Sequence, residues 1–261
     1  MCKGRSWFLA LLLLQATGCS TFCEGMLADA CRQLPAPTTP PAVDFSFFQP
    51  VSEPHPGIRR LCETAPQGEK DRLHLYFVNG LDPLYAGNFR GLGDYVRSLG
   101  FGNVYLGQLH HCAHFRQSII NLKRDEPNAK IVLLGYSAGA NAIRALAHTL
   151  DKDHVEIESL VYVGGDTIKN EPLSRPPNVR RILNINGHGA LMLGYGLYYD
   201  GDNLDGAENH RVSAKHLMLP AQVETAELLA KHLTKLCVEC DAPAWNSGRV
   251  SRVTASSPVR R

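Results

Sequence analysis

The sequence predicts a single α/β domain whose mostly parallel sheet is covered by helices on both faces. Short apolar runs of strand length alternate with segments whose apolar residues recur at helical spacing. Some of these runs are continuously apolar, which is typical of strands buried on both faces of a sheet. The connections are short, as in strand–helix–strand units. A chain of 261 residues with 44% apolar residues can bury one sizeable core.

The expected elements follow one another from residue 73 to residue 233. The expected strands are residues 73–78, 103–106, 131–134, 160–163, 182–185 and 209–213. The expected helices carry apolar stripes at Phe89, Leu92, Val96 and Leu99; at Phe115, Ile119 and Leu122; at Ile143, Leu146, Ala147 and Leu150; and at Val223, Ala226, Ala230 and Leu233. Gly100 ends the first of these helices, and Pro127 limits the second. Reactive groups are expected just beyond the carboxyl ends of the strands.

The N-terminus predicts export. Basic residues precede the apolar stretch Trp7–Leu14, which is too short to span a bilayer and is typical of a signal peptide. Ala16-Thr17-Gly18-Cys19 resembles the bacterial lipobox, although Ala16 stands where leucine is commoner. We therefore expect residues 1–18 to be a signal peptide and Cys19 to carry a lipid anchor at the cell envelope. Plain cleavage with secretion and an uncleaved anchor are the alternatives.

The regions flanking the domain have a different composition. Prolines recur from residue 35 to residue 56, which predicts an extended N-terminal segment over residues 19–69, ahead of a folded domain at residues 70–240. The tail at residues 241–261 carries Arg249, Arg252, Arg260 and Arg261 and is expected to be disordered. A net charge of +2 gives no reason to expect a nucleic acid or a polyanionic partner.

Eight cysteines suit an oxidising compartment. If Cys2 leaves with the signal and Cys19 is lipidated, six remain, enough for three disulfides of undetermined pairing. We expect the cysteines of Cys237-Val-Glu-Cys240 to belong to a structural disulfide rather than to a zinc site. A zinc site needs about four ligands, and no second paired-cysteine element is present.

The run Gly135-Tyr136-Ser137-Ala138-Gly139 is the most specific functional motif. It follows a buried-strand run and precedes a helical stripe, the context in which G-x-S-x-G forms a nucleophile elbow. Side chains at the glycines would collide with the neighbouring backbone in so tight a turn. The dipole of the helix that follows favours negative charge at the serine. Ser137 is the predicted nucleophile, against the alternative of an inert serine in a glycine-rich turn.

With this elbow and the strand–helix order of residues 70–236, the chain resembles the α/β-hydrolase superfamily, and more loosely its lipases and esterases. The resemblance implies an α/β-hydrolase-type fold. It also implies a serine hydrolase that cleaves a small-molecule or lipid ester without a cofactor or a metal. In this superfamily the triad follows the chain order serine, acid, histidine.

The base is predicted to be His216. His188, His210 and His232 are also late enough in the chain, but the stretch Lys215–Pro220 looks like the catalytic histidine loop of small esterases. His188 comes too early for the family order, and His210 lies within the last strand. His232 is expected to be a solvated residue of the final helix.

The acid is less well defined by the sequence. Its usual position, just after the strand at 182–185, carries no carboxylate. Asp202 is the favoured residue, with Asp205 and Asp166 as alternatives, because any carboxylate that reaches the histidine can hold its tautomer. The oxyanion hole is expected to combine the amide of Ala138 with that of Leu81.

One further cluster of potential metal ligands follows the second expected strand. His110, His111, Cys112 and His114 are interpreted as a polar loop at the rim of the active site, because consecutive residues rarely converge on one metal ion. The alternative functions are a non-catalytic envelope lipoprotein that binds a lipid or protein partner, and thiol–disulfide exchange through Cys237 and Cys240. Rossmann, P-loop and HExxH motifs are absent from the sequence.

Overall fold

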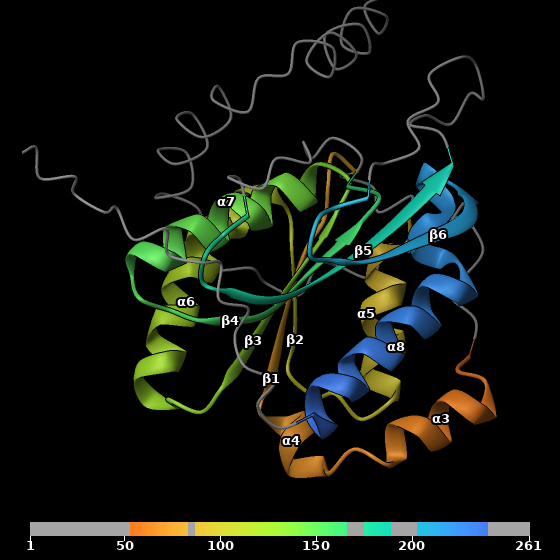
Figure 1. Cartoon of the computed structure of the whole chain (residues 1–261), viewed down its shortest axis with the longest axis horizontal. Coiled ribbons are helices and arrows are strands. Elements are labelled where there is room, and N and C mark those ends of the chain that lie inside the picture. The colour runs from red at the N-terminus through yellow and green to blue at the C-terminus, as the bar shows by residue number, and fades with distance from the viewer. Residues whose placement is uncertain (1–52, 83–86, 166–174, 189–202, 240–261) are drawn as a thin grey trace, which may run out of the picture.

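Within the described residues, six strands form one fully parallel sheet in the order β2-β1-β3-β4-β5-β6 (Figure 1). The computed structural model describes residues 53–82, 87–165, 175–188 and 203–239. The strands are Leu73–Val78 (β1), Val104–Gly107 (β2), Lys130–Tyr136 (β3), Ile157–Val163 (β4), Val179–His188 (β5) and Glu208–Lys215 (β6). This arrangement confirms the predicted α/β fold, in which helices cover a parallel sheet.

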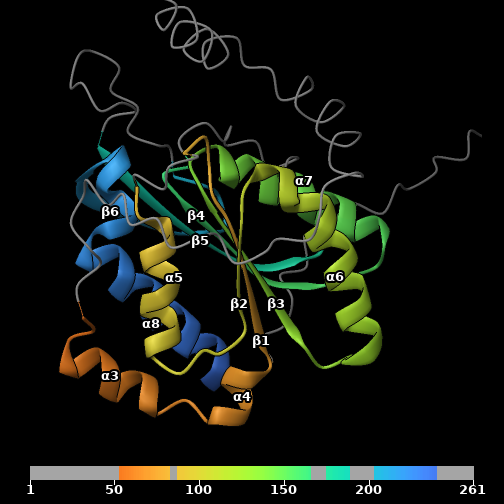
Figure 2. The same cartoon turned by 180° about the vertical axis from the view of Figure 1, so that it is seen from behind.

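Helices cover both faces of the sheet, as Figure 1 and the reverse view in Figure 2 show. The helices are Pro56–Glu63 (α3), Gln67–Asp71 (α4), Phe89–Ser98 (α5), Cys112–Asp125 (α6), Ala138–Lys152 (α7) and Val223–Val238 (α8), with short 3-10 helices at Leu109–His111 (η2) and His216–Ala221 (η4). α6 and α7 lie on one face, and α3, α4, α5 and α8 lie on the other.

Alternation along the strands builds a core on each face. On β1, Leu75 and Phe77 belong to the core beneath α5 and α8, whereas Tyr76 and Val78 belong to the core beneath α6 and α7. The predicted stripe of α7 is confirmed, because Ile143, Leu146, Ala147 and Leu150 are all buried in the second core.

Two helices, α3 and α4, begin before residue 70, the predicted start of the domain. α3 packs against α8 and contributes Ile58 and Cys62 to the first core. Residues 1–52, with the expected signal peptide and Cys19, lie outside the described residues, as do residues 240–261 with Cys240. Among the helices of the described part, none is both long and apolar enough to cross a membrane.

The structure does not support the expected disulfide at Cys237. Cys62 and Cys237 are free thiols within the described residues. Cys237 lies on the core-facing side of α8 and is 2% exposed, and this burial raises the pKa of its thiol to about 11. A thiol held neutral in the core is a poor nucleophile for disulfide exchange.

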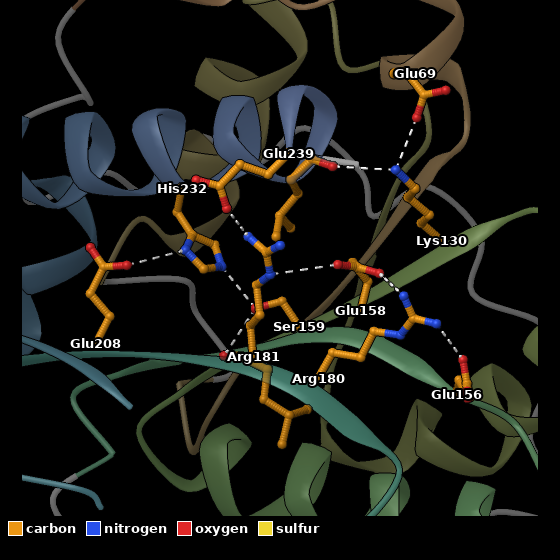
Figure 3. A network of polar contacts seen from close by, with 12 residues as sticks. Glu69, Lys130, Glu156, Glu158, Ser159, Arg180, Arg181, Glu208, His232 and Glu239 are labelled. Atoms are coloured by element: carbon orange, nitrogen blue, oxygen red, sulfur yellow. Dashed lines mark hydrogen bonds and ion pairs between the residues drawn. The ribbon is translucent and has the colours of Figure 1, made fainter. Parts of the chain in front are cut away.

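The amino ends of the strands carry a network of ion pairs (Figure 3). Lys130 pairs with Glu69 at 2.9 Å, Arg180 pairs with Glu156 at 2.8 Å, and Arg181 pairs with Glu239 at 2.8 Å. A groove of about 400 Å³ runs along this edge between several of these residues. It lies at the opposite end of the strands from Ser137, which follows the carboxyl end of β3.

His232 is buried rather than solvated, so the sequence-based expectation was wrong. It is 4% exposed, and its Nε2 lies 2.8 Å from Ser159 Oγ on β4 (Figure 3). Its Nδ1 lies 3.8 Å from a carboxylate oxygen of Glu208. Because Leu229, Leu233 and Leu236 share its side of α8, His232 faces the sheet despite the lysines beside it in sequence.

Replacing Glu208 with glutamine should make the stability of the folded protein less sensitive to low pH. Interaction with His232, followed by a 2.9 Å hydrogen bond with His210, lowers the pKa of Glu208 from 4.5 to about 2. The 3.8 Å between the Glu208 carboxylate and His232 Nδ1 is longer than a hydrogen bond. The His232 ring therefore stabilises the carboxylate through its charge when the ring is protonated. The stabilisation is fully present above pH 4.5 and is lost as the pH falls toward 2.

The side chain of Glu208 is 47% exposed, so solvent screening should keep its contribution below about 1 kcal/mol. Thermal unfolding measured at pH 5 and pH 3 checks this. The drop in melting temperature between the two should be smaller in Glu208→Gln than in the wild type. Equal drops would contradict the assignment, and Glu224→Gln, on the first turn of α8, is the control.

Candidate active site

Ser137 occupies a sharp turn between β3 and α7. Its backbone has φ 54° and ψ −125°, a region that non-glycine residues rarely adopt. Its amide donates to the carbonyl of Val163 on β4 at 3.0 Å, which fixes the turn to the sheet. A serine at the N-cap, just before the first helical residue, normally caps an amide with its hydroxyl, but Ser137 makes no such bond. The Ser137 hydroxyl therefore does not cap the amino end of α7, which is the usual role of a serine at this position.

The glycines flanking the turn are required by backbone contacts. A Cβ atom on Gly139 would lie 2.1 Å from the carbonyl oxygen of Val78 on β1. One on Gly135 would lie 2.4 Å from the carbonyl oxygen of Gly139. Atoms of the main chain cannot rotate out of the way, so only glycine fits. The predicted reason for glycine at these two positions of the elbow is confirmed.

The loop after β1 lies directly against the elbow. A Cβ atom on Gly80 would lie 2.8 Å from Ser137 Cβ and 3.1 Å from the amide nitrogen of Ala138. The buried side chain of Asn79 holds the loop, donating to the carbonyl of Asp82 at 2.8 Å and accepting from the amide of Gly80 at 3.0 Å.

The two amides predicted for the oxyanion hole occupy this region. Ala138 is the first residue of α7, where helical amides have no partner within the helix. Leu81 follows Gly80, and its side chain is 49% exposed. In the described part of the chain neither amide donates to an acceptor. Leu81 and Ala138 are the sequence neighbours of Gly80 and Ser137, which lie close together.

His216 begins η4, immediately after β6. Its ring stacks on that of Tyr136, with centroids 5.3 Å apart and planes at 25°. The hydroxyl of Tyr136 donates to the backbone carbonyl of His216 at 3.1 Å. A Cβ atom on Gly164, just beyond β4, would lie 3.0 Å from Nδ1 of His216. His216 is thus held at the carboxyl edge of the sheet, beside the residue that precedes Ser137.

The described residues contain no hydrogen bond between the Ser137 hydroxyl and the His216 ring. Such bonds are often long or absent without substrate and tighten in the Michaelis complex. The structure therefore brings Ser137, the backbones of Leu81 and Ala138, and His216 to one edge of the sheet. Ser137 and His216 are not hydrogen-bonded to each other there.

Of the three carboxylates proposed as the triad acid, the structure describes only Asp205. Asp202 and Asp166 lie outside the described residues. Asp205 precedes the amino end of β6, whereas His216 follows its carboxyl end. These ends lie beside β5 residues 183 and 188, five residues or roughly 16 Å apart. Asp205 is therefore out of reach of His216.

The histidine-rich segment after β2 forms a structured turn. The ring Nδ1 of His111 accepts from the amide of Gln108 at 2.9 Å, and the ring of His110 lies 4.0 Å from that of His111. Burial, with the neighbouring His110 and His114, lowers the pKa of His111. Within the described residues, no group of three or more His, Cys, Asp or Glu side chains could hold a metal ion.

The sequence did not point to three of the residues that organise this edge. Tyr136 lies inside the elbow motif, but the motif predicts a role only for the serine and the glycines. Asn79 and Gly164 each follow a strand and were placed at the correct edge, but without a role. Their partners are distant in sequence, and only an alignment of related chains could have revealed such pairs.

No family model matches the chain, and no curated protein matches it. Among solved structures, the chain is similar to a cutinase-like protein from Cryptococcus sp., at 13% identity and a TM-score of 0.36, covering 63% of this chain and 95% of that one. It is also similar to the NocB thioesterase domain of the nocardicin cluster, at 15% identity and a TM-score of 0.39, covering 64% and 96%. A thioesterase from Streptomyces coelicolor gives 11% identity, a TM-score of 0.36, and coverage of 81% and 95%.

Proposed function

We propose that the chain is a serine hydrolase that cleaves a carboxylic ester through an acyl-enzyme at Ser137. The observation that carries this proposal is the backbone of Ser137, which is held at φ 54° between a strand and a helix with its hydroxyl not used as a cap. Strain of this kind costs of the order of 1–3 kcal/mol and persists at sites where it serves function. A small-molecule or lipid ester is the proposed substrate class.

In the proposed reaction, the Ser137 oxygen attacks the ester carbonyl while a ring nitrogen of His216 takes the hydroxyl proton. The amides of Ala138 and Leu81 donate to the oxyanion that forms, at the positive end of the α7 dipole. His216 then gives the proton to the departing alcohol. Water attacks the acyl-enzyme by the same route and releases the acid. Every step uses groups of the chain and water.

The acid that orients His216 is proposed to be Asp202 or Asp166. The sequence ranks Asp202 first, whereas the contact between His216 Nδ1 and Gly164 favours Asp166, two residues further along. Replacing each by asparagine separates them, because the loss of the carboxylate that holds the tautomer lowers kcat by about 10⁴-fold in a well-studied serine protease. The variant with the larger loss in kcat identifies the acid.

The proposed location is the cell envelope, with Cys19 lipidated after removal of the signal peptide. The basic start, the short apolar stretch and the small residues before Cys19 support this. Mass spectrometry of the mature N-terminus tests it. A diacylated Cys19 is expected, and a mature chain that begins elsewhere would exclude the anchor.

Ser137→Ala should abolish covalent labelling by a fluorophosphonate probe. The probe phosphonylates an activated serine, so loss of the one hydroxyl removes the reactive atom. Ser159→Ala is a matched control, because Ser159 also lies beside a histidine but is fully buried. Labelling should persist in this control. Folded wild-type protein that fails to react would instead support a non-catalytic envelope lipoprotein.

A further inference from the structure

Tyr136 is a buried residue of β3 that contacts the proposed base, His216. It is 1% exposed, so its side chain is enclosed by the protein rather than available to a substrate. Its ring lies against two others: that of His216, at 5.3 Å and 25°, and that of Phe89 on α5, at 5.6 Å and 30°. It immediately precedes Ser137 in the chain.

Tyr136 contacts His216 in two independent ways. The hydroxyl donates to the His216 carbonyl at 3.1 Å and so restrains the backbone from which the imidazole extends. The ring stack restrains the plane of the imidazole itself. A buried hydroxyl is costly to leave unpaired, so the hydrogen bond ties β3 to η4 over 80 residues of sequence.

The same side chain also contacts the loop that supplies the oxyanion amide. A Cβ atom on Gly87 would lie 3.0–3.2 Å from the ring and hydroxyl of Tyr136. The amide of Gly87 donates to the carboxylate of Asp82 at 2.8 Å, and the carbonyl of Asp82 accepts from Asn79. One rigid side chain thus packs against the loop after β1 and the loop after β6.

We infer that Tyr136 is a positioning residue that sets the orientation of His216 relative to Ser137. This inference rests on the proposed function. Proton transfer between two groups requires them to lie within hydrogen-bond reach, and displacement of the base by about 1 Å can reduce the rate by about 10²-fold. Tyr136 acts on the base through the ring stack and through the hydrogen bond to its backbone carbonyl, so its effect on the reaction passes through His216.

A graded pair of substitutions tests this role. Tyr136→Phe keeps the ring stack and removes the hydrogen bond, and Tyr136→Leu removes both. The measurement is the rate of fluorophosphonate labelling as a function of probe concentration, with thermal unfolding recorded for each variant. We expect the maximum rate constant to fall by about tenfold in Tyr136→Phe and about 100-fold in Tyr136→Leu. The probe concentration at half-maximum should stay within about twofold, because the restraint acts on the base rather than on binding.

Tyr95→Phe is the control, because Tyr95 is also buried, and its hydroxyl has no hydrogen-bond partner within the described residues. Its rate constant should match the wild type. If Tyr136 only stabilised the fold, Tyr136→Phe would lower the melting temperature and leave the rate constant of the folded fraction unchanged, and that result overturns the inference. If Tyr136→Leu does not fold, Tyr136→Phe decides alone. A folded wild type that fails to react overturns the proposed function, and the inference with it.

Discussion

Replacing His216 with alanine should reduce ester hydrolysis by at least about 10³-fold while the protein stays folded. Without a base, the Ser137 hydroxyl remains protonated at neutral pH and is a weak nucleophile. His216 is half-buried at the carboxyl edge of the sheet, and losing its ring stack on Tyr136 should cost only about 1 kcal/mol, so the protein should stay folded. The measurement is kcat for p-nitrophenyl butyrate, with thermal unfolding as the check on folding.

His210→Ala is the matched control for this loss. His210 lies on the same strand that leads to His216, but its ring bonds to Glu208 at the amino end of β6. Its kcat should stay within about twofold of the wild type, since the ring takes no part in the proposed proton transfer. If His210→Ala lost activity and His216→Ala kept it, the assignment of the base would be wrong.

Replacing Gly139 with alanine should destabilise the protein and abolish its reactivity together. The new methyl group would lie 2.1 Å from the Val78 carbonyl oxygen, and the main chain of β1 cannot yield without breaking sheet hydrogen bonds. Overpacking of this kind costs up to about 3 kcal/mol, and more where backbone must move. For a domain of this size, 3 kcal/mol corresponds to a fall of about 6–12 °C in melting temperature.

Gly68→Ala provides the comparison for that change. Gly68 lies in α4, and a Cβ atom there meets nothing within 4 Å. Alanine is favoured over glycine within a helix, so this variant should unfold at the wild-type temperature or slightly above it. Calorimetry checks both. A Gly139→Ala protein that melts with the wild type would show that the elbow is looser than the distances imply.

Much of the fold was predictable because its signals are local. The continuous apolar run at residues 131–134 corresponds to β3, and the stripe from Ile143 to Leu150 corresponds to the buried side of α7. Both follow from side-chain periodicity and burial. The observed strands extend beyond the apolar runs, as β5 does at Arg180 and Arg181, because charged side chains at the sheet edge are satisfied by ion pairs.

The candidate site was predictable to a smaller extent. The elbow at Ser137 could be recognised because the need for glycine on either side arises within five consecutive residues. The role of His216 came from its place in the chain order. The exposure of His232 was misjudged, since neighbouring lysines indicate solvent but do not reveal which side of α8 faces the sheet.

The alternation of strands and helices, the buried faces and the turn that holds Ser137 can be read from local sequence patterns. Three features can be seen only in the folded chain: Gly80 lies against Ser137, Asp205 is out of reach of His216, and Tyr136 bonds to that histidine. The physical reason is the range of the interactions. Periodicity and backbone conformation act over a few residues, whereas the bond between Tyr136 and His216 joins positions 80 residues apart, which come together only when the sheet has formed.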